Sequence, residues 1–468
     1  MQSRISELES GDAVTVAKAA RDALFTGADR TQELAWWGGS FCSWLGGRWQ
    51  KVDRKVVEDM LWQGLGEAVV VTRGEAERRK RWAPTRNSVS DVMRALEALV
   101  TLRLKEVPQF ISGEVMDPML ARRIVAFDDV LLDVVTGETM RRGPNWFDLG
   151  VSPVRWEDRG CGCPTWERLV MEWGAGDPEW VECLRRMMGY AILSWRGLHK
   201  WVLMYGKVRS GKGTIMRVLE RLVGPGYQGV SLRALYEKFG MAGITGTKVL
   251  SIGEVSRLTG KEGEMTCMTI KGITTGDPMQ VWTHYRPPEN GVRVGGLVVV
   301  QSNEIPSLPD SMEGLTSKMI LMPFTQSWLG KEDMDLSSKL EAELPGIAAW
   351  VVEGSRRVLE AKDARTAIPL CKRAQDAVLM FRDQSNPVAV WLGEYFEQST
   401  DWVSYKTFRK LWLKTGGTVA DSHSLMTKIV ESSPWPLRHW RANGENRLVG
   451  ISLKNKSDRF DDRTSDND

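Results

Sequence analysis

Residues 201–224, WVLMYGKVRSGKGTIMRVLERLVG, combine three kinds of pattern in immediate succession. An apolar run from Trp201 to Tyr205 is typical of a buried strand. A glycine-rich turn follows, and apolar residues then recur at helical spacing from Ile215 to Val223. A strand that enters a glycine loop and leaves it as a helix favours an α/β fold in which the loop binds phosphate groups.

The loop has the residue types that phosphate binding requires. Its glycines let backbone N–H groups close around phosphates, and the start of the following helix adds a partial positive charge. The lysine would reach the β- and γ-phosphates of a nucleotide. The alternative is a glycine turn that binds no ligand. The predicted nucleotide-binding residues are Gly206, Ser210, Gly211, Lys212, Gly213 and Thr214.

One position in the loop departs from the usual pattern, which has Ser or Thr directly after the lysine to hold Mg²⁺. Here Gly213 follows Lys212, and the hydroxyl comes one residue later, at Thr214. GKGT loops occur in working nucleotide enzymes, so the departure does not exclude a nucleotide site. Thr214 is therefore the candidate Mg²⁺ ligand of the loop, and the identity of the ligand stays open.

Two further apolar stretches end in polar residues that suit a nucleotide site. Residues 248–254 end in Glu254, which could hold Mg²⁺ or polarise the attacking water. Residues 295–303 end in Asn303, which could orient that water against the γ-phosphate. Each of these residues alone could be an ordinary polar residue at the end of a strand. The glycine loop and both strand ends, in this order, predict a nucleotide hydrolase with a three-layer α/β core.

Between these two strands, the sequence predicts the end of a helix and then a strand that enters a protruding hairpin near residues 287–291. His284, Tyr285 and Arg286 lie near the tip of that hairpin. A cation beside an aromatic ring suits single-stranded nucleic acid, because the charge contacts phosphate and the ring contacts a base or sugar. The alternative is a surface hairpin that binds no ligand.

Five segments in this order resemble the motif series of superfamily 3 helicases: GKVRSGKGT, KVLSIGE, IKGITTGDPMQV, VVVQSNEIPSLPD and LTSKMILMPF. The resemblance is greatest to the helicase half of phage and plasmid primases, the D5/P4-like group. Three further segments resemble the domain that precedes the helicase core in that group: FCSWLGGRWQKV, IVAFDDVLLDVVTGE and PTWERLV. The match covers about residues 34–455. We expect no fused primase domain, because the residues before 34 are too few to form one.

The resemblance implies a ring, usually a hexamer, that binds ATP and Mg²⁺ between neighbouring subunits and threads single-stranded DNA through its channel. The hairpin that matches residues 282–291 would grip this DNA, and Lys271 falls on the lysine of the family's third motif. Lys212 and Thr214 would bind phosphate. Glu254 would be the second acidic motif and Asn303 the sensor.

The trans-acting arginine of the family is replaced in this sequence. The segment that matches residues 315–324 has Lys318 instead. A lysine supplies charge but lacks the planar fork that grips a phosphate with two hydrogen bonds. Either Lys318 acts in trans less well, or Arg257 or Arg293 takes over, or hydrolysis is slow. The alternative is that Lys318 is a surface lysine with no catalytic part.

The fold class that follows is α/β: a P-loop, AAA+-like superfamily 3 helicase core, with a mixed α/β domain before it and a winged helix after it. We predict seven segments along the chain. They are a helical segment (1–30), a D5-like mixed α/β domain (31–150), a linker and helical collar (151–195), the ATPase core (196–355), connecting helices (356–386), a winged-helix-like domain (387–455) and a disordered tail (456–468).

Local patterns within the mixed domain predict several elements. Trp44 to Trp49 flank a Gly-Gly turn that indicates a small hairpin, and residues 56–65 follow as a helix. Residues 124–139 alternate like paired strands with a turn near Thr136. The basic run at residues 73–82 is interpreted as a solvated helix face rather than a nucleic-acid site.

The last region reads as three helices followed by two strands, a winged-helix order. The helices are expected at 388–397, 405–415 and 422–431, and the strands near 437–441 and 447–453. Residues 372–456 contain 13 Lys and Arg against 8 Asp and Glu, which favours DNA contact, including contact with duplex. The alternative is a winged helix that binds protein. The candidate DNA-binding residues are Lys428, Arg438, His439, Arg441 and Arg447.

Composition adds a few exclusions. The net charge of +3 is too small to indicate nucleic-acid binding by itself. The six cysteines are scattered, and no second cysteine pair or nearby histidine completes a zinc site around Cys161 and Cys163. Reduced thiols in a cytosol are therefore the expectation. The sequence has no signal-peptide pattern and no apolar run of membrane-spanning length, so we expect a cytoplasmic protein without a membrane partner.

These patterns and the resemblance predict a cytoplasmic, ATP-dependent DNA helicase, a homo-oligomeric ring that acts in replication of a phage, prophage or plasmid. A separate primase or polymerase could be a further partner. One alternative is a replication initiator or loader ring that binds ATP with weak or no hydrolysis. Another is a small-molecule kinase, because GKGT loops also occur in nucleoside-monophosphate kinases. The Asn-ended strand, the hairpin and the basic carboxyl-terminal region argue against the kinase.

Overall fold

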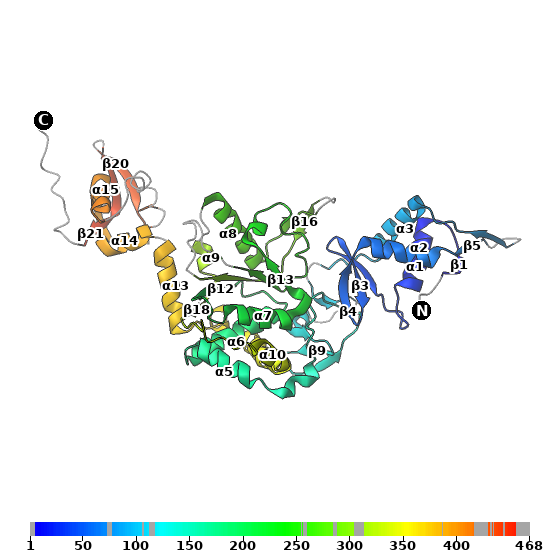
Figure 1. Ribbon diagram of the computed structural model, residues 1–468. Helices are drawn as coiled ribbons and strands as arrows, with labels where there is room; N and C mark the ends of the chain where they lie inside the picture. The colour runs from blue at the N-terminus through cyan, green and yellow to red at the C-terminus, as the bar shows by residue number, and fades with distance from the viewer. Residues whose placement is uncertain are drawn as a thin grey trace, which may run out of the picture. The chain divides into compact units, whose positions relative to one another are not determined.

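The structure of the protein is a computed structural model, and its described residues form two compact units (Figure 1). The larger unit comprises residues 1–306 and 317–374, and the carboxyl-terminal unit comprises residues 307–316 and 375–468. The described residues are 5–72, 77–104, 107–111, 118–253, 255, 260–283, 288–303, 313–385, 387–415, 429–430, 433, 435–442 and 445–454.

The chain begins with a small helical core. Helices α1 (Ala13–Leu24), α2 (Arg54–Leu65) and α3 (Arg86–Leu99) each start at a residue whose side chain caps the first turn. The caps are Asp12, Asp53 and Thr85. The apolar faces of the three helices pack into one cluster. Helix α1 occupies residues 13–24 of the segment 1–30 that was predicted to be helical, and β1 (Glu7–Leu8) lies before it. The helix predicted at 56–65 is confirmed.

A three-stranded meander lies between α1 and α2. Strand β2 (Leu34–Trp37) pairs with β3 (Ser40–Leu45), which pairs with β4 (Arg48–Val52). Gly46 and Gly47 join β3 to β4 with φ angles of 57° and 78°, in the left-handed region that glycine adopts without a Cβ penalty. The hairpin predicted around this Gly-Gly turn is confirmed.

Residues 78–81 of the basic run form a strand rather than a helix face, so that prediction is wrong for them. Strands β1 (Glu7–Leu8), β5 (Val69–Thr72) and β6 (Arg78–Arg81) form a sheet in the order β1-β5-β6. The four cations of β6 are all exposed on this edge strand. Backbone pairing with β5 fixes the strand, although arginine and lysine favour helices by intrinsic propensity. Charge on both faces of an edge strand discourages pairing with another chain.

Short strands lead from this region to the central sheet. Strand β9 (Val130–Asp133) pairs with β8 (Ile124–Ala126) and with β10 (Thr139–Arg141), which confirms the paired strands predicted there. A second pair is β7 (Gln109–Phe110) with β11 (Trp146–Phe147). The short helices of this part are α4 (Pro118–Arg123) and η1 (Trp156–Cys161).

Four helices form a layer beneath the central sheet. They are α5 (Pro164–Trp173), α6 (Pro178–Ile192), α10 (Leu336–Ala342) and α11 (Leu344–Leu359). Helices α6 and α11 cross closely because glycines meet there: a Cβ on Gly189 would collide with the Ser355 backbone, and a Cβ on Gly354 with the Arg185 carbonyl. Ser355 Oγ donates to the Gly189 carbonyl at 2.9 Å across this crossing.

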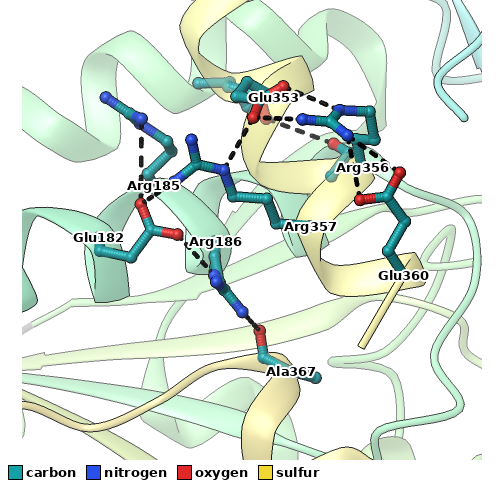
Figure 2. A network of polar contacts seen from close by, with 10 residues as sticks. Glu182, Arg185, Arg186, Glu353, Arg356, Arg357, Glu360 and Ala367 are labelled. Carbon is teal, nitrogen blue, oxygen red and sulfur yellow. Dashed lines mark hydrogen bonds and ion pairs between the residues drawn. The ribbon is translucent and has the colours of Figure 1, made fainter. Parts of the chain in front are cut away.

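Ion pairs extend the same helix crossing toward solvent. Figure 2 shows Glu182 of α6 between Arg186 of its own helix and Arg357 of α11, each with a nitrogen 2.7 Å from a carboxylate oxygen. Glu353 bonds both Arg356 and Arg357 on α11. Networks of this kind exceed the small contribution of an isolated surface pair because each charge has several partners.

The central sheet has five parallel strands in the order β13-β14-β17-β12-β18. Their bounds are β12 (Trp201–Gly206), β13 (Tyr227–Val230), β14 (Val249–Ile252), β17 (Leu297–Ser302) and β18 (Met319–Phe324). All five run in the same direction, and β12, β14, β17 and β18 are buried along nearly their whole length. The predicted α/β class is confirmed.

Helices cover both faces of this sheet. The chain crosses from β12 to β13 through α7 (Lys212–Val223) and returns from β14 to β17 through α8 (Gly260–Thr275). Because right-handed crossovers in opposite directions use opposite faces, α7 and α8 lie on different sides of the sheet (Figure 1). Strands β15 (Met279–Val281) and β16 (Glu289–Val292) form the hairpin after α8. Short helices η2 (Gly224–Gly226), η3 (Leu232–Leu235) and α12 (Ala364–Ala367) complete this unit.

The carboxyl-terminal unit has its own core. Helices α14 (Pro387–Tyr395) and α15 (Tyr405–Lys414) pack with a sheet of order β19-β21-β20 around Phe396, Phe408 and Leu448. The strands are β19 (Phe396–Ser404), β20 (Arg438–Ala442) and β21 (Glu445–Leu453). Helix α13 (Lys372–Ser385) precedes them, and α9 (Glu313–Thr316) also belongs here.

Two helices and both strands predicted for this unit are confirmed with small shifts. The first helix ends at Tyr395 rather than continuing to 397, because β19, which the sequence did not predict, begins at Phe396. Most of the third predicted helix, 422–431, lies outside the described residues.

Two further features bear on the expectations from composition. All six cysteines are free. Within the described ranges, no helix is both long and apolar enough to cross a membrane.

Candidate functional site

The glycine loop lies at the carboxyl end of β12, between that strand and α7. Apolar residues bury the strand and one face of the helix, so both ends of the loop are fixed in the core. Strands β17 and β18 flank β12, so whatever follows Ser302 or Phe324 also lies at this edge. The strand order therefore brings the end of β17 beside the loop.

Two glycines of the loop are required by its geometry, and one is not. Gly206 has φ 138°, and a Cβ there would collide with the Phe324 carbonyl. Gly211 caps α7 with φ 99°, and its Cβ would lie 2.5 Å from the Trp173 ring. Among the described residues, no atom lies within 4 Å of a Cβ on Gly213. The position that departs from the usual phosphate-loop pattern is thus also the one with free space.

Lys212 is folded into the loop rather than extended into solvent. The residue is only 8% exposed, and its Nζ donates to the carbonyls of Gly206 at 2.6 Å and Lys207 at 2.8 Å. The same Nζ lies 3.3 Å from Ser210 Oγ and 3.3 Å from Asn303 Oδ1. A buried ammonium needs such oxygen partners because it has lost its water. Its position marks the point in the loop where negative charge is favoured.

Asn303 follows β17 directly, as the sequence indicated, and its amide oxygen faces the loop lysine. Neighbouring interactions hold the end of β17: Ser302 Oγ donates to the Val255 carbonyl at 2.5 Å, and the Val255 N–H donates to the Gln301 carbonyl at 3.1 Å. These bonds tie the segment after β14 to the end of β17. Glu254 belongs to that segment but lies outside the described residues.

The hydroxyl group of the loop already has one hydrogen-bond partner. Thr214 Oγ1 accepts a hydrogen bond from Arg217 Nη2 at 3.1 Å, one turn later on α7. A hydroxyl oxygen has two lone pairs, so one remains for a metal ion. In the described part of the chain, no three His, Cys, Asp or Glu residues gather as a metal-binding group.

A cavity of about 500 Å³ opens beside the loop, between it and helices α5 and α10. Gly211 and Thr214 border it on the loop side, and Trp173 and Trp328 supply aromatic walls. Sequence reasoning missed both tryptophans as site residues. Trp173 belongs to the apolar face of α5, and Trp328 follows β18 with no motif around it; only the folded chain brings them to the loop. The Trp328 N–H donates to the Arg209 carbonyl at 2.9 Å.

Cations border this cavity as well. Five cationic residues line it: Arg168, Arg209, Arg217, Arg221 and Lys331. Arg209 forms an ion pair with Glu332 at 3.6 Å, and Arg221 pairs with Glu341 at 3.1 Å. Glu172, Glu332 and Asp333 line the cavity too, so its five cations exceed its acidic residues by two. The cavity thus offers aromatic surface for a flat ring and a small excess of positive charge for an anion, the combination that a nucleotide requires.

The predicted trans-acting lysine lies at the opposite edge of the sheet. Lys318 immediately precedes β18, and its carbonyl accepts from the Trp201 N–H at the amino end of β12. A six-residue strand, roughly 20 Å long, separates it from the loop of its own chain. Lys200 lies close by: burial, followed by the charges of Lys318 and Arg365, lowers its pKa. Lys318 therefore lies too far from the loop of its own chain to contact a group bound there.

The structure describes some of the remaining candidate residues. These are the arginines that could replace Lys318 and the residues predicted to contact DNA in the channel. Lys271 is exposed on α8. Arg293 follows β16 and donates to the Gly276 carbonyl. Strands β15 and β16 form the predicted hairpin. The tip residues His284, Tyr285 and Arg286, as well as Arg257, lie outside the described residues.

The candidate residues of the carboxyl-terminal unit divide between two faces of its sheet. Arg438 is paired with Val449 across the strands, and Arg447 with Trp440. Because paired residues share a face and successive residues alternate, Arg438 and Arg447 lie on one face. His439 and Arg441, paired with Leu448 and Asn446, lie on the other. Lys428 lies outside the described residues.

Comparisons with known proteins give similarity in fold only. No protein-family model matches the sequence, and no curated protein matches it. The chain is similar to a solved apo structure of the NrS-1 C-terminal region (305–718), with 10% identity and a TM-score of 0.49 over 95% of this chain and 100% of the other.

Two further structures of that region were found. An A-form apo structure has 9% identity and a TM-score of 0.44 over 88% of this chain and 94% of the other. An A-form structure of residues 305–718 has 9% identity and a TM-score of 0.47 over 95% and 100%.

Proposed function

We propose that the protein is an ATP-driven motor that translocates on or unwinds DNA during replication of a phage, prophage or plasmid. The observation that carries the proposal is the meeting of Lys212 Nζ and Asn303 Oδ1 at 3.3 Å, at the carboxyl edge of a parallel sheet. A lysine in a glycine loop beside a strand-end amide is an arrangement suited to a γ-phosphate and an attacking water.

ATP would bind across the loop and the cavity beside it. Phosphate oxygens would accept hydrogen bonds from the backbone N–H groups at the start of α7. Lys212 Nζ would donate to phosphate oxygens instead of to the carbonyls of Gly206 and Lys207. The cavity of about 500 Å³ supports this, because it has room and aromatic surface for the base and ribose. A bound Mg²⁺, with Thr214 and Glu254 as its proposed ligands, would neutralise charge on the phosphates.

Hydrolysis would be the attack of water on the γ-phosphate. Asn303 would orient that water, and a cation from a neighbouring subunit, Lys318 in this proposal, would stabilise the developing charge. Strand β17 and the hairpin β15–β16 are joined by residues 293–296 alone. A displacement at Asn303 could therefore move the hairpin and any DNA held by it.

A second candidate function is a ring that binds ATP but hydrolyses it slowly, such as a replication initiator or loader. One observation favours it: Thr214 Oγ1 is already bonded to Arg217, and no hydroxyl stands at Gly213. A magnesium ion would then be held less firmly at the loop. ATP binding with little turnover distinguishes this candidate from the motor.

The test is steady-state ATP hydrolysis with and without single-stranded DNA. Wild type is compared with Lys212→Ala, and with Lys18→Ala as a matched control, because Lys18 is an exposed lysine of α1. The motor predicts hydrolysis that rises with DNA, is retained in Lys18→Ala and is lost in Lys212→Ala. A wild-type protein that binds ATP but does not hydrolyse it would overturn the motor and support the initiator ring.

A further inference from the structure

One face of the carboxyl-terminal sheet carries two tryptophans with an arginine between them. Strand β21 is central, with β19 on one side and β20 on the other. Arg447 of β21 lies directly opposite Trp440 of β20, and Trp402 of β19 lies opposite Val449. Residues 447 and 449 share a face, so Trp402, Arg447 and Trp440 lie side by side on it. We call these three residues the Trp–Arg–Trp platform.

The platform is on the outer side of the sheet. Its two tryptophans are 46% and 56% exposed, although tryptophan is usually well covered in a folded chain. The alternate residues point into the core of this unit, where Leu448 and Val403 are buried. Neither Trp402 nor Trp440 belongs to this core. The packing of the described residues of the unit therefore does not account for large aromatic side chains at these positions.

Arg447 orients the platform. Its guanidinium carbon lies 3.7 Å from the centroid of the Trp402 ring, a close cation–π contact. The contact uses one face of the ring and leaves the other face for a second flat group. Arg438, on the same face of the sheet and next to Trp440 along β20, adds a further cation.

Aromatic rings interleaved with arginines match one class of ligand, a strand of nucleic acid with unpaired bases. Rings stack on bases and arginines bind phosphates, without regard to sequence. In a duplex the faces of the bases are stacked on each other and closed to a flat sheet surface. The excess of 13 cationic over 8 acidic residues in 372–456 adds charge complementarity to a polyanion.

We propose that the Trp–Arg–Trp platform binds single-stranded nucleic acid, with bases stacked on Trp402 and Trp440 and phosphates held by Arg447 and Arg438. Strand spacing puts the two tryptophan Cα atoms roughly 12 Å apart, since they are two strands and two residues apart. This is several times the rise of about 3.4 Å per stacked nucleotide. The two rings would therefore take bases that are not adjacent. This inference deepens the proposed function by naming the nucleic acid that this unit binds.

The test measures binding of a fluorescent oligo(dT) and of a duplex of equal length to the full chain, without ATP. Trp402→Ala and Trp440→Ala should each weaken oligo(dT) binding by roughly 5- to 100-fold, the effect of losing one stacked base. Trp440→Phe keeps a ring and should retain most of the affinity. Arg447→Gln should weaken binding, whereas Arg441→Gln, on the opposite face, should have a smaller effect.

A second measurement distinguishes binding at the platform from binding elsewhere in the chain. An oligonucleotide with 5-iodouracil is cross-linked by ultraviolet light, and the attachment sites are mapped by mass spectrometry; we expect peptides that contain Trp402 or Trp440. Unchanged affinity in the double alanine variant, or no cross-link on these peptides, would overturn the platform, and a protein-binding face predicts this result. Equal effects of Arg441→Gln and Arg447→Gln would also overturn it.

ATP hydrolysis measured in the same wild-type sample separates the two proposals. Hydrolysis that rises with DNA, together with a failed platform test, overturns only the platform. Absence of hydrolysis, together with tryptophan-dependent binding of oligo(dT), overturns only the motor.

Discussion

At the scale of single residues, the two glycines on either side of Lys212 predict opposite effects of the same substitution. Gly211→Ala places a Cβ at φ 99° and within 2.5 Å of the Trp173 ring. The left-handed backbone alone costs roughly 1–3 kcal/mol, and the ring contact adds to that cost. Gly213→Ala places a Cβ in the first turn of α7, where no atom of the described residues lies within 4 Å. It should gain about 0.5–1 kcal/mol.

The measurement is the thermal unfolding midpoint of the two variants without nucleotide. We expect a lower midpoint for Gly211→Ala and an equal or higher one for Gly213→Ala. Equal destabilisation by both would contradict the loop geometry. A further consequence is chemical: because the described residues leave space at Gly213, their packing does not impose the absence of a hydroxyl there.

At the scale of elements, the crossing of α6 and α11 depends on close backbone contact. Gly189→Ala would drive a Cβ into the Ser355 backbone and should destabilise the larger unit by roughly 1–3 kcal/mol, the usual cost of overpacking. Gly272→Ala is the matched control, because Gly272 lies inside α8 and, of the described residues, only Met279 comes near, with its Cε at 3.5 Å. That control should be neutral or stabilising. Thermal unfolding of both variants checks the prediction, and a control as unstable as Gly189→Ala would count against it.

The ion pairs at the same crossing predict a dependence on pH. Burial alone would raise the pKa of Glu182, but hydrogen bonds and charge from Arg186 and Arg357 outweigh it and lower the pKa below 4.5. A carboxyl whose pKa is lowered by folding stabilises the fold above its unfolded pKa. That stabilisation is lost as pH falls through the folded value. The α6–α11 crossing should therefore weaken in acid.

Glu182→Gln tests this contribution. At pH 7 it should cost roughly 1–2 kcal/mol, because Arg185, Arg186 and Arg357 lose a charged partner that is 22% exposed. The difference from wild type should shrink as pH falls below 4.5. The measurement is hydrogen exchange of the α6 and α11 amides, from pH 7 downward and corrected for intrinsic rates. It reports the local stability difference between wild type and Glu182→Gln at each pH. A difference that stays constant with pH would refute the assignment.

The elements also show what sequence patterns can and cannot predict. The strand, loop and helix around Lys212 depend on neighbours along the chain, so periodicity and glycine spacing were sufficient. Asn303 was predictable because it ends an apolar run. Trp173 and Trp328 were not, since tertiary packing alone brings them to one cavity. Residues 78–81 form a strand because β5 pairs with them, which propensity could not predict.

At the scale of the whole molecule, the proposed reaction requires more than one copy of the chain. Lys318 lies at the amino edge of the central sheet and the glycine loop at the carboxyl edge, so a single chain cannot bring both to one nucleotide. If Lys318 supplies the trans cation, subunits must meet head to tail. Heterologous contacts of this kind close into rings when the rotation permits.

Mixing two inactive variants tests this arrangement. Lys212→Ala removes the loop lysine and Lys318→Ala the trans cation, so each variant alone should hydrolyse ATP poorly. A mixed assembly contains interfaces with an intact loop on one side and an intact Lys318 on the other. At equal amounts these are about a quarter of all interfaces, so the mixture should regain about a quarter of wild-type hydrolysis. Lys318→Arg should hydrolyse ATP faster than wild type, because it restores the planar fork. No recovery on mixing, from variants that still assemble, would assign the trans cation elsewhere, and Arg293→Ala would then be mixed with Lys212→Ala.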